Sequence, residues 1–225
     1  MLTYQPASLP NHLKVYLTTA AGCLLSLQVN AAIGLPSSAS DNHPWSVTAS
    51  LGYTDYQQAY QSDGQTALGR LAIDRALFIK KHTALGLELG VQNGNSMRLD
   101  APQATLDVLG GLPIQSTVKP LLDLLATAKT EALGKSLVFA QVKGGIAYRR
   151  WQFEDRTSVS NLSNIAGELQ AGFGIPLSQT TNLSLLYQGI YGGNPNFTVN
   201  ATNGTGHVST IPIQQGALLS LSVTV

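Results

Sequence analysis

Residues 137–153, LVFAQVKGGIAYRRWQF, alternate between two chemically different sets of side chains. Val138, Val142 and Ile146 belong to the apolar set, and Lys143 and Arg149 belong to the polar set. Because successive side chains of a β-strand point to opposite sides, a period of two over this length predicts a strand with two unlike faces. The alternation by itself does not say which face meets solvent, or whether that solvent is water.

The low charge of the chain restricts the answer. Charged residues make up 11% of the sequence, and none follows Glu168, whereas ordinary soluble domains contain ~25% charged residues. A soluble domain keeps mixed charges over its surface, so we expect much of this surface not to face water. After residue 35 no uninterrupted apolar run reaches the ~18 residues that a membrane helix needs. Since membranes admit only helices and closed barrels, the sequence predicts a barrel.

Residues 1–31 are predicted to be a signal peptide. His12 and Lys14 precede the apolar run VYLTTAAGCLLSLQV, and VNA offers small residues before a cut near Ala31. An anchoring helix and lipid attachment at Cys23 are the alternatives. Without residues 1–31 the chain has 12 Lys and Arg (13 less Lys14) and 12 Asp and Glu, so its formal net charge is zero. This balance provides no basic surface for nucleic acid, and loss of Cys23 leaves no disulfide framework.

Eight segments with period-two patterning are separated by turn residues. The fourth is also rich in helix formers, so a helix over 119–133 is an open alternative. Short links alternate with longer ones along the chain, which is typical of membrane barrels. The expected fold is all-β, an eight-stranded antiparallel up-and-down transmembrane β-barrel over 43–225, preceded by a short segment at 32–42. The segments are 45–56, 66–79, 83–97, 116–128, 137–153, 164–176, 182–192 and 210–225.

With an export signal, eight alternating segments and sorted loops, residues 43–225 resemble the small bacterial outer-membrane barrels, the OmpA-like and OmpX-like transmembrane domains. The resemblance implies location in the outer membrane of a Gram-negative bacterium, contact with its lipid and lipopolysaccharide, and insertion by the barrel-insertion machinery. Aromatic residues near segment ends then form a girdle at the membrane surfaces. Its expected members are Trp45, Tyr148, Trp151, Phe153, Tyr187 and Tyr191.

If the apolar faces meet lipid, the opposite faces line the interior. An eight-stranded barrel is only wide enough for its own side chains, and buried ions need partners because desolvating an unpaired ion costs several kcal/mol. We therefore expect a salt-bridge network, with Glu88 and Lys143 among its members and with inward Gly and Ala leaving room. Surface charges on a soluble sheet are the alternative. The eight expected members are Arg70, Asp74, Glu88, Lys119, Asp123, Lys143, Arg149 and Glu168.

Arg75 does not fit this pattern, because it falls on the apolar face of the second segment. Two explanations are open. Arg75 reaches the lipid headgroups near the KKH turn, where the penalty for a charge falls to ~0–1 kcal/mol, or a β-bulge reorients the strand.

The sequence contains no convincing catalytic or metal-binding motif. The four histidines His12, His43, His82 and His207 are isolated from one another, so we expect no metal site. His207 and Ser209 resemble the His-x-Ser pair of some outer-membrane lipid A deacylases, but no Asp or Glu follows them to orient the base. GFGIP lacks the third glycine of a dinucleotide loop. We expect no enzyme activity and no cofactor.

The expected function is a structural or surface-interaction role, in which extracellular loops contact a host or cell-surface ligand. A narrow pore for ions or small solutes is the first alternative. The second is a soluble secreted β-barrel that binds a hydrophobic ligand, in which case the apolar faces point inward.

Overall fold

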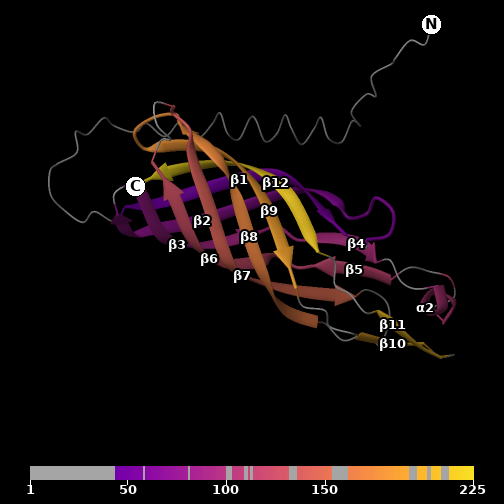
Figure 1. Ribbon diagram of the computed structural model, residues 1–225. Coiled ribbons are helices and arrows are strands. Elements are labelled where there is room, and N and C mark those ends of the chain that lie inside the picture. Colours follow the sequence, from indigo (N-terminus) through magenta and orange to yellow (C-terminus); the bar gives the residue numbers. More distant parts are fainter. Residues whose placement is uncertain are drawn as a thin grey trace, which may run out of the picture. The chain divides into compact units, whose positions relative to one another are not determined.

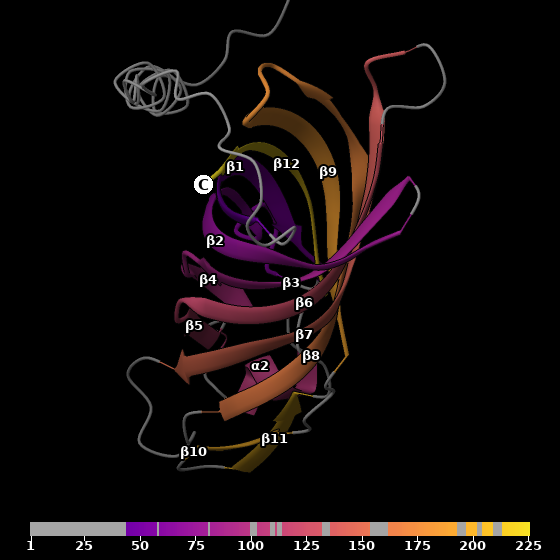
Figure 2. The ribbon, with the colours of Figure 1, turned by 90° about the vertical axis from the view of Figure 1, so that its left-hand side faces the viewer.

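Eight antiparallel strands close into a barrel in the computed structural model (Figures 1 and 2). The first strand, β1, pairs with the last, β12, and β7 pairs with both β6 and β8, so the hydrogen-bonded ring has no free edge. The barrel strands are β1 (Trp45–Tyr56), β2 (Gln65–Lys80), β3 (Thr83–Gln92), β6 (Leu121–Thr130), β7 (Phe139–Phe153), β8 (Leu162–Pro176), β9 (Thr181–Tyr191) and β12 (Gln214–Thr224). The structure describes residues 44–57, 59–80, 82–99, 103–108, 111, 114–131, 136–153, 162–192, 197–201, 204–208 and 213–225.

The two ends of the barrel differ in their connections. One end, the short-turn end, carries the β2–β3, β6–β7 and β8–β9 connections together with the start of β1 and the end of β12. The other, the long-loop end, carries the remaining elements (Figure 1). These are β4 (Asn95–Leu99), α2 (Gln103–Val108), β5 (Ile114–Val118), β10 (Phe197–Ala201) and β11 (Gly204–Val208).

Two predicted strands are interrupted where the chain leaves the barrel. Segment 83–97 divides at Asn93 and Gly94 into β3 and β4, which forms a hairpin with β5. Segment 116–128 is strand and not helix, but it divides at Lys119 and Pro120 into β5 and β6. Proline cannot donate to a strand ladder. Because the two-residue break resets the alternation, Val118 is buried, although the sequence pattern placed it outward.

The outward face of the barrel is apolar and the inward face is polar. Leu89 is 60% exposed, whereas Arg70, which points inward, is 2% exposed. Inward positions also hold buried Ser, Thr and Gln side chains along several strands. This distribution is the reverse of that in a soluble barrel with a hydrophobic interior, so the secreted binding-protein alternative is wrong. The predicted closed barrel with an apolar exterior and a polar interior is confirmed.

Arg75 faces outward, with its guanidinium carbon 5.0 Å from the centroid of the Trp45 ring. The register of β2 shifts after it, between Ala76 and Phe78. The bulge is therefore real, but it does not turn Arg75 inward. In the described part of the chain, no helix is long and apolar enough to cross a membrane. The predicted signal peptide (1–31) and N-terminal segment (32–42) lie outside the described residues.

Candidate functional site in the barrel interior

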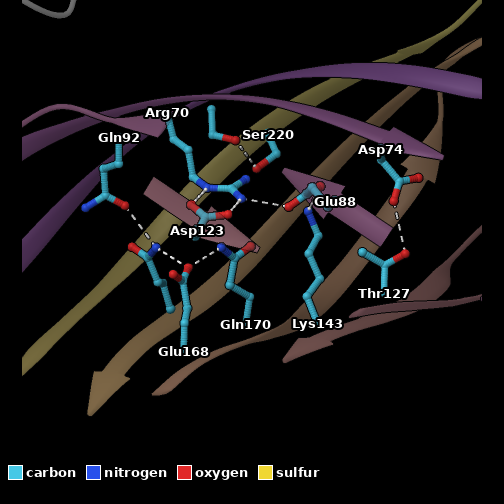
Figure 3. Close-up of polar contacts among 12 residues, drawn as sticks. Arg70, Asp74, Glu88, Gln92, Asp123, Thr127, Lys143, Glu168, Gln170 and Ser220 are labelled. Atoms are coloured by element: carbon cyan, nitrogen blue, oxygen red, sulfur yellow. Dashed lines mark hydrogen bonds and ion pairs between the residues drawn. The ribbon is translucent and has the colours of Figure 1, made fainter. Parts of the chain in front are cut away.

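Four charged side chains from four strands meet at the middle of the barrel (Figure 3). Arg70 donates to Asp123 from Nε, at 2.9 Å, and from Nη2, and Nη2 also lies 2.8 Å from Glu88 Oε1. The second Glu88 oxygen lies 2.6 Å from Lys143 Nζ. Acid and base therefore alternate along the ion cluster, which we define as Asp123, Arg70, Glu88 and Lys143. All four are almost completely buried, so each ion depends on its neighbours for stabilisation.

A glycine on β3 leaves the space that the ion cluster occupies. A Cβ atom at Gly90 would collide with Arg70 Nη2 and would come within 2.6 Å of Asp123 Oδ1. Gly90 is the strand partner of Asp123 and lies two residues from Glu88. The absence of a side chain at Gly90 therefore allows the Arg70 guanidinium and the Asp123 carboxylate to lie in contact.

Glu168 lies beside the ion cluster and is held by amides. Its Oε1 accepts hydrogen bonds from Gln170 Nε2 and Gln188 Nε2, both at 2.7 Å, and Gln188 also donates to Gln92 Oε1 at 2.9 Å. No lysine or arginine of the described residues forms an ion pair with Glu168. The sequence analysis did not assign these glutamines, although Gln92 and Gln170 share the inward parity of Glu88 and Glu168 on their own strands. Gln188 lies on β9, which has no charged residue.

An apolar layer follows the ion cluster toward the long-loop end. It consists of Leu121, Ala147, Ala166 and Ile190, which pack together and are buried. Each lies on the long-loop side of a polar inward residue on the same strand, as Leu121 does relative to Asp123 and Ile190 relative to Gln188. A second buried group contains Leu68 of β2, Leu186 of β9 and Leu218 of β12. Side chains therefore fill the barrel above the ion cluster.

A cavity of about 160 Å³ occupies the short-turn side. Its walls carry hydroxyl groups such as those of Thr48 and Ser220, and it extends to Glu88 and Lys143. We call it the inner vestibule. Asp74 lies here rather than in the ion cluster, and accepts a hydrogen bond from Thr127 Oγ1 at 3.0 Å. Lys129, which the sequence analysis did not assign, also lines it, with Nζ 4.2 Å from the Phe139 ring centroid.

Lys119 and Arg149, two further residues expected in the network, lie away from the ion cluster. Lys119 is exposed between β5 and β6, so its assignment to the interior is wrong, because the break at Pro120 takes it out of the barrel wall. Arg149 is buried and inward, but near the long-loop end. Its Nη2 lies 3.2 Å from the carbonyl oxygen of Gly192.

Four of the six residues expected in the aromatic girdle have an outward side chain. Trp45, Tyr148, Tyr187 and Tyr191 face outward near strand ends. Trp151 is 1% exposed and faces inward, so its assignment to the girdle is wrong. It shares the parity of Lys143 and Arg149, and the alternation of β7 already indicated this orientation. The Phe153 side chain lies outside the described residues. Tyr53 also faces outward, where its hydroxyl donates to Gln65 Oε1 at 2.8 Å.

The described residues contain no group of three or more His, Cys, Asp or Glu side chains placed to hold a metal ion. Ser209 and the His207 side chain, the pair weighed as a nucleophile and its base, lie outside the described positions.

Solved structures share this architecture. A major outer membrane protein from Thermus thermophilus aligns over 82% of this chain and 100% of its own, with a TM-score of 0.51 and 16% identity. The chain has the fold of the small outer-membrane β-barrels. Neisserial surface protein A aligns over 81% of this barrel chain and 99% of its own, with a TM-score of 0.46 and 12% identity. The attachment invasion locus protein of Yersinia pestis, in complex with the heparin analogue sucrose octasulfate, covers 81% of this chain and 97% of its own, with a TM-score of 0.47 and 8% identity. No protein-family model and no curated protein matches the sequence.

Proposed function

We propose that the protein is a non-enzymatic integral barrel of the outer membrane of a Gram-negative bacterium, with a structural or surface-interaction role. Its outward apolar face fits a lipid environment, in which a closed barrel satisfies every backbone hydrogen bond. Outer-membrane lipid and lipopolysaccharide are its expected surroundings, and the barrel-insertion machinery is its expected assembly partner. Nucleic acid is not an expected partner.

The filled interior is the observation that carries this proposal. The ion cluster and the apolar layer occupy successive levels of the barrel, and both consist of buried side chains. A solute crossing the barrel would have to separate buried ion pairs and then displace packed apolar groups. The interior therefore supports a sealed wall rather than bulk transport.

The short elements β4, α2, β5, β10 and β11 lie at the long-loop end. We expect recognition of a ligand to take place at this end. Arg98 on β4 reaches back to the β1–β2 connection, with Nε 2.6 Å from Asp63 Oδ2 and Nη2 2.9 Å from Asp63 Oδ1. The Arg98 guanidinium carbon also lies 5.0 Å from the Tyr60 ring centroid. These contacts fix two neighbouring connections to each other, and a host or cell-surface ligand would bind on this end.

The orientation can be tested by cysteine labelling in a Cys23→Ser background. Asp107→Cys on α2 and Ser178→Cys in the β8–β9 connection are both at exposed positions. A membrane-impermeant maleimide added to intact cells should label Asp107→Cys at once, and Ser178→Cys only after the outer membrane is permeabilised. The opposite order would refute a surface role for the long-loop end. In detergent gels, an unheated band that migrates like the boiled one would contradict a stable barrel.

The inner vestibule favours a second candidate, a narrow pore for ions or small solutes. The vestibule extends from the short-turn side to the Glu88–Lys143 ion pair. A solute that entered the vestibule would then have to pass this ion pair and the apolar layer to cross the barrel. Planar-bilayer recordings separate the two candidates. A sealed barrel gives no reproducible conductance, whereas a conductance that changes in Lys143→Ala would support the pore.

A further inference from the structure

A second polar group lies beyond the apolar layer, at the long-loop end of the interior. We define the outer polar cluster as Tyr56, Arg149, Trp151 and Gln214, which are all buried. Tyr56 and Gln214 are partners in the β1–β12 ladder, and Arg149 and Trp151 are consecutive inward residues of β7. The apolar layer lies between this cluster and the ion cluster along the strands.

The two rings and the guanidinium are in contact with one another. The Tyr56 and Trp151 rings meet edge to face, with centroids 6.5 Å apart at an interplanar angle of 87°. The guanidinium carbon of Arg149 lies 5.9 Å from the Trp151 ring centroid, and its Nη2 donates to Gly192 O. The positive charge of Arg149 is thereby held beside the indole.

Two members of this cluster, Trp151 and Gln214, carry buried polar atoms without a hydrogen-bond partner among the described residues. Trp151 Nε1 and both side-chain polar atoms of Gln214 are buried and have no hydrogen-bond partner among the described residues. Asn95 Nδ2 is a further buried donor without a partner in the described part of the chain, and Asn95 is joined to Trp151 through Val118 in the strand ladder. Native proteins pair nearly all such groups with protein, water or ligand. Three of these four atoms are donors if the Gln214 amide is oriented as in the structure.

We propose that the outer polar cluster binds a small oxyanion, such as the phosphate or carboxylate group of a solute. An oxyanion supplies several acceptor lone pairs to the unpartnered N–H groups of Trp151 and Gln214, and the adjacent guanidinium favours negative charge. The apolar layer closes the site on its inner side, so the ligand enters from the long-loop end.

This inference adds a small-molecule site to the proposed surface role and does not depend on it. Binding is measured on the purified, folded barrel, and surface exposure is measured on cells. Either result can fail without the other.

Trp151 provides the readout because the chain has only two tryptophans. In Trp45→Phe, all tryptophan emission comes from Trp151. Inorganic phosphate, and separately acetate, is titrated against chloride at constant ionic strength. We expect a saturable change in emission in Trp45→Phe and none in Trp151→Phe, whose remaining Trp45 faces outward. A water-filled site would give no saturable change with either anion, and that result would overturn the proposal.

Gln214 and Gln215 provide a matched pair of variants. Gln214→Glu replaces the amide donor by a carboxylate within the site, and we expect at least about tenfold weaker phosphate binding. Gln215→Glu makes the same change on the other face of β12 and should retain binding. Equal losses in both variants would indicate a general effect of charge and would overturn the proposal. Folding of each variant is checked by its unheated gel band, and if Gln214→Glu does not fold, Gln214→Leu is expected to show the same loss.

Discussion

At the scale of single residues, Glu88 has the central place in the interior because its two carboxylate oxygens bind different cations. Replacing it by Gln leaves Arg70 and Lys143 with one acid, Asp123, between them. Breaking a buried ion pair on one side typically costs ~3–5 kcal/mol, because the remaining charge stays buried without compensation. A buried ion pair often adds little stability compared with two apolar side chains in its place, but removal of only one partner is strongly destabilising.

We expect Glu88→Gln to lower the free energy of unfolding by about 3 kcal/mol. Urea unfolding in lipid vesicles, followed by the heat-modifiable band, measures the change. The double variant Glu88→Gln, Lys143→Met should recover part of the loss, because it removes the uncompensated ammonium group. If Glu88→Gln unfolds at the same urea concentration as the parent protein, the ion cluster does not contribute to stability.

Gly90 permits a second test at the same scale. We expect Gly90→Ala to destabilise the barrel by ~1–3 kcal/mol, as overpacking does elsewhere, because its methyl group would enter the space of the Arg70 guanidinium. Gly144→Ala is the control, since a Cβ there would meet only atoms at ordinary contact distance, the nearest at 3.9 Å. The same unfolding assay applies to both. Equal effects of the two substitutions would contradict a role for Gly90 in the fit of the ion cluster.

At the scale of elements, the strands were predictable because a wall between lipid and a polar interior imposes a period of two. The breaks were not predictable to the same degree. Lys119 follows Val118 with unbroken alternation in the sequence, and only Pro120 signals that β5 and β6 are separate. The orientation of Trp151 was predicted wrongly for a different reason. Its place in the alternation of β7 indicates an inward side chain, whereas its place near the strand end favours a position in the girdle.

Sequence patterning also could not place the interior residues relative to one another. The alternation showed that Asp74, Arg149 and Glu88 face inward, but a strand pattern contains no information on height within the barrel. Height depends on the register of each pair of strands. That register places Asp74 in the inner vestibule and Arg149 in the outer polar cluster.

The contact between the β1–β2 connection and β4 should depend on pH. Hydrogen bonds from Arg98 hold the pKa of Asp63 below its ordinary value of 3.8. A lowered pKa means that the stabilisation is complete above the ordinary pKa and is lost as pH falls through the lowered one. We therefore expect this contact to persist at neutral pH and to weaken only below pH 3.8.

Hydrogen exchange of the Arg98 amide checks this expectation, because that N–H donates to Asp63 Oδ2 at 3.2 Å. Its protection should decrease in the acid range in the parent protein. Asp63→Asn should show no corresponding decrease. Protection lost already between pH 5 and 7 would contradict the assigned direction of the pKa.

At the scale of the whole molecule, closure depends on the first and last strands finding each other. Ser50 and Ser220 are ladder partners on the inward face, their hydroxyl oxygens 2.8 Å apart although 170 positions separate them in the chain. Directly opposed residues of antiparallel strands come within the Cα separation that a disulfide spans, about 4.4–6.8 Å.

We expect Ser50→Cys, Ser220→Cys in a Cys23→Ser background to form an intramolecular disulfide on mild oxidation. After boiling without reductant, the cross-linked chain should migrate faster than the reduced chain, because the bond closes a large loop. Ser50→Cys, Ser222→Cys, which shifts one partner by two positions on the same face, should cross-link less. Equal cross-linking of both pairs would contradict the β1–β12 register.

The lipid-facing side chains of β1 begin at Trp45, which supports Arg75, and end at Tyr53, after which Asp55 follows. Trp45 and Asp55 are ten residue steps apart (55 − 45), and at ~3.3 Å per step and a tilt of ~40° the strand between them spans about 25 Å of membrane. A typical hydrocarbon core is ~30 Å thick, and the bacterial outer membrane is thinner than average. The barrel is thus matched to a thin bilayer, and in a thicker one the lipid around it would be compressed.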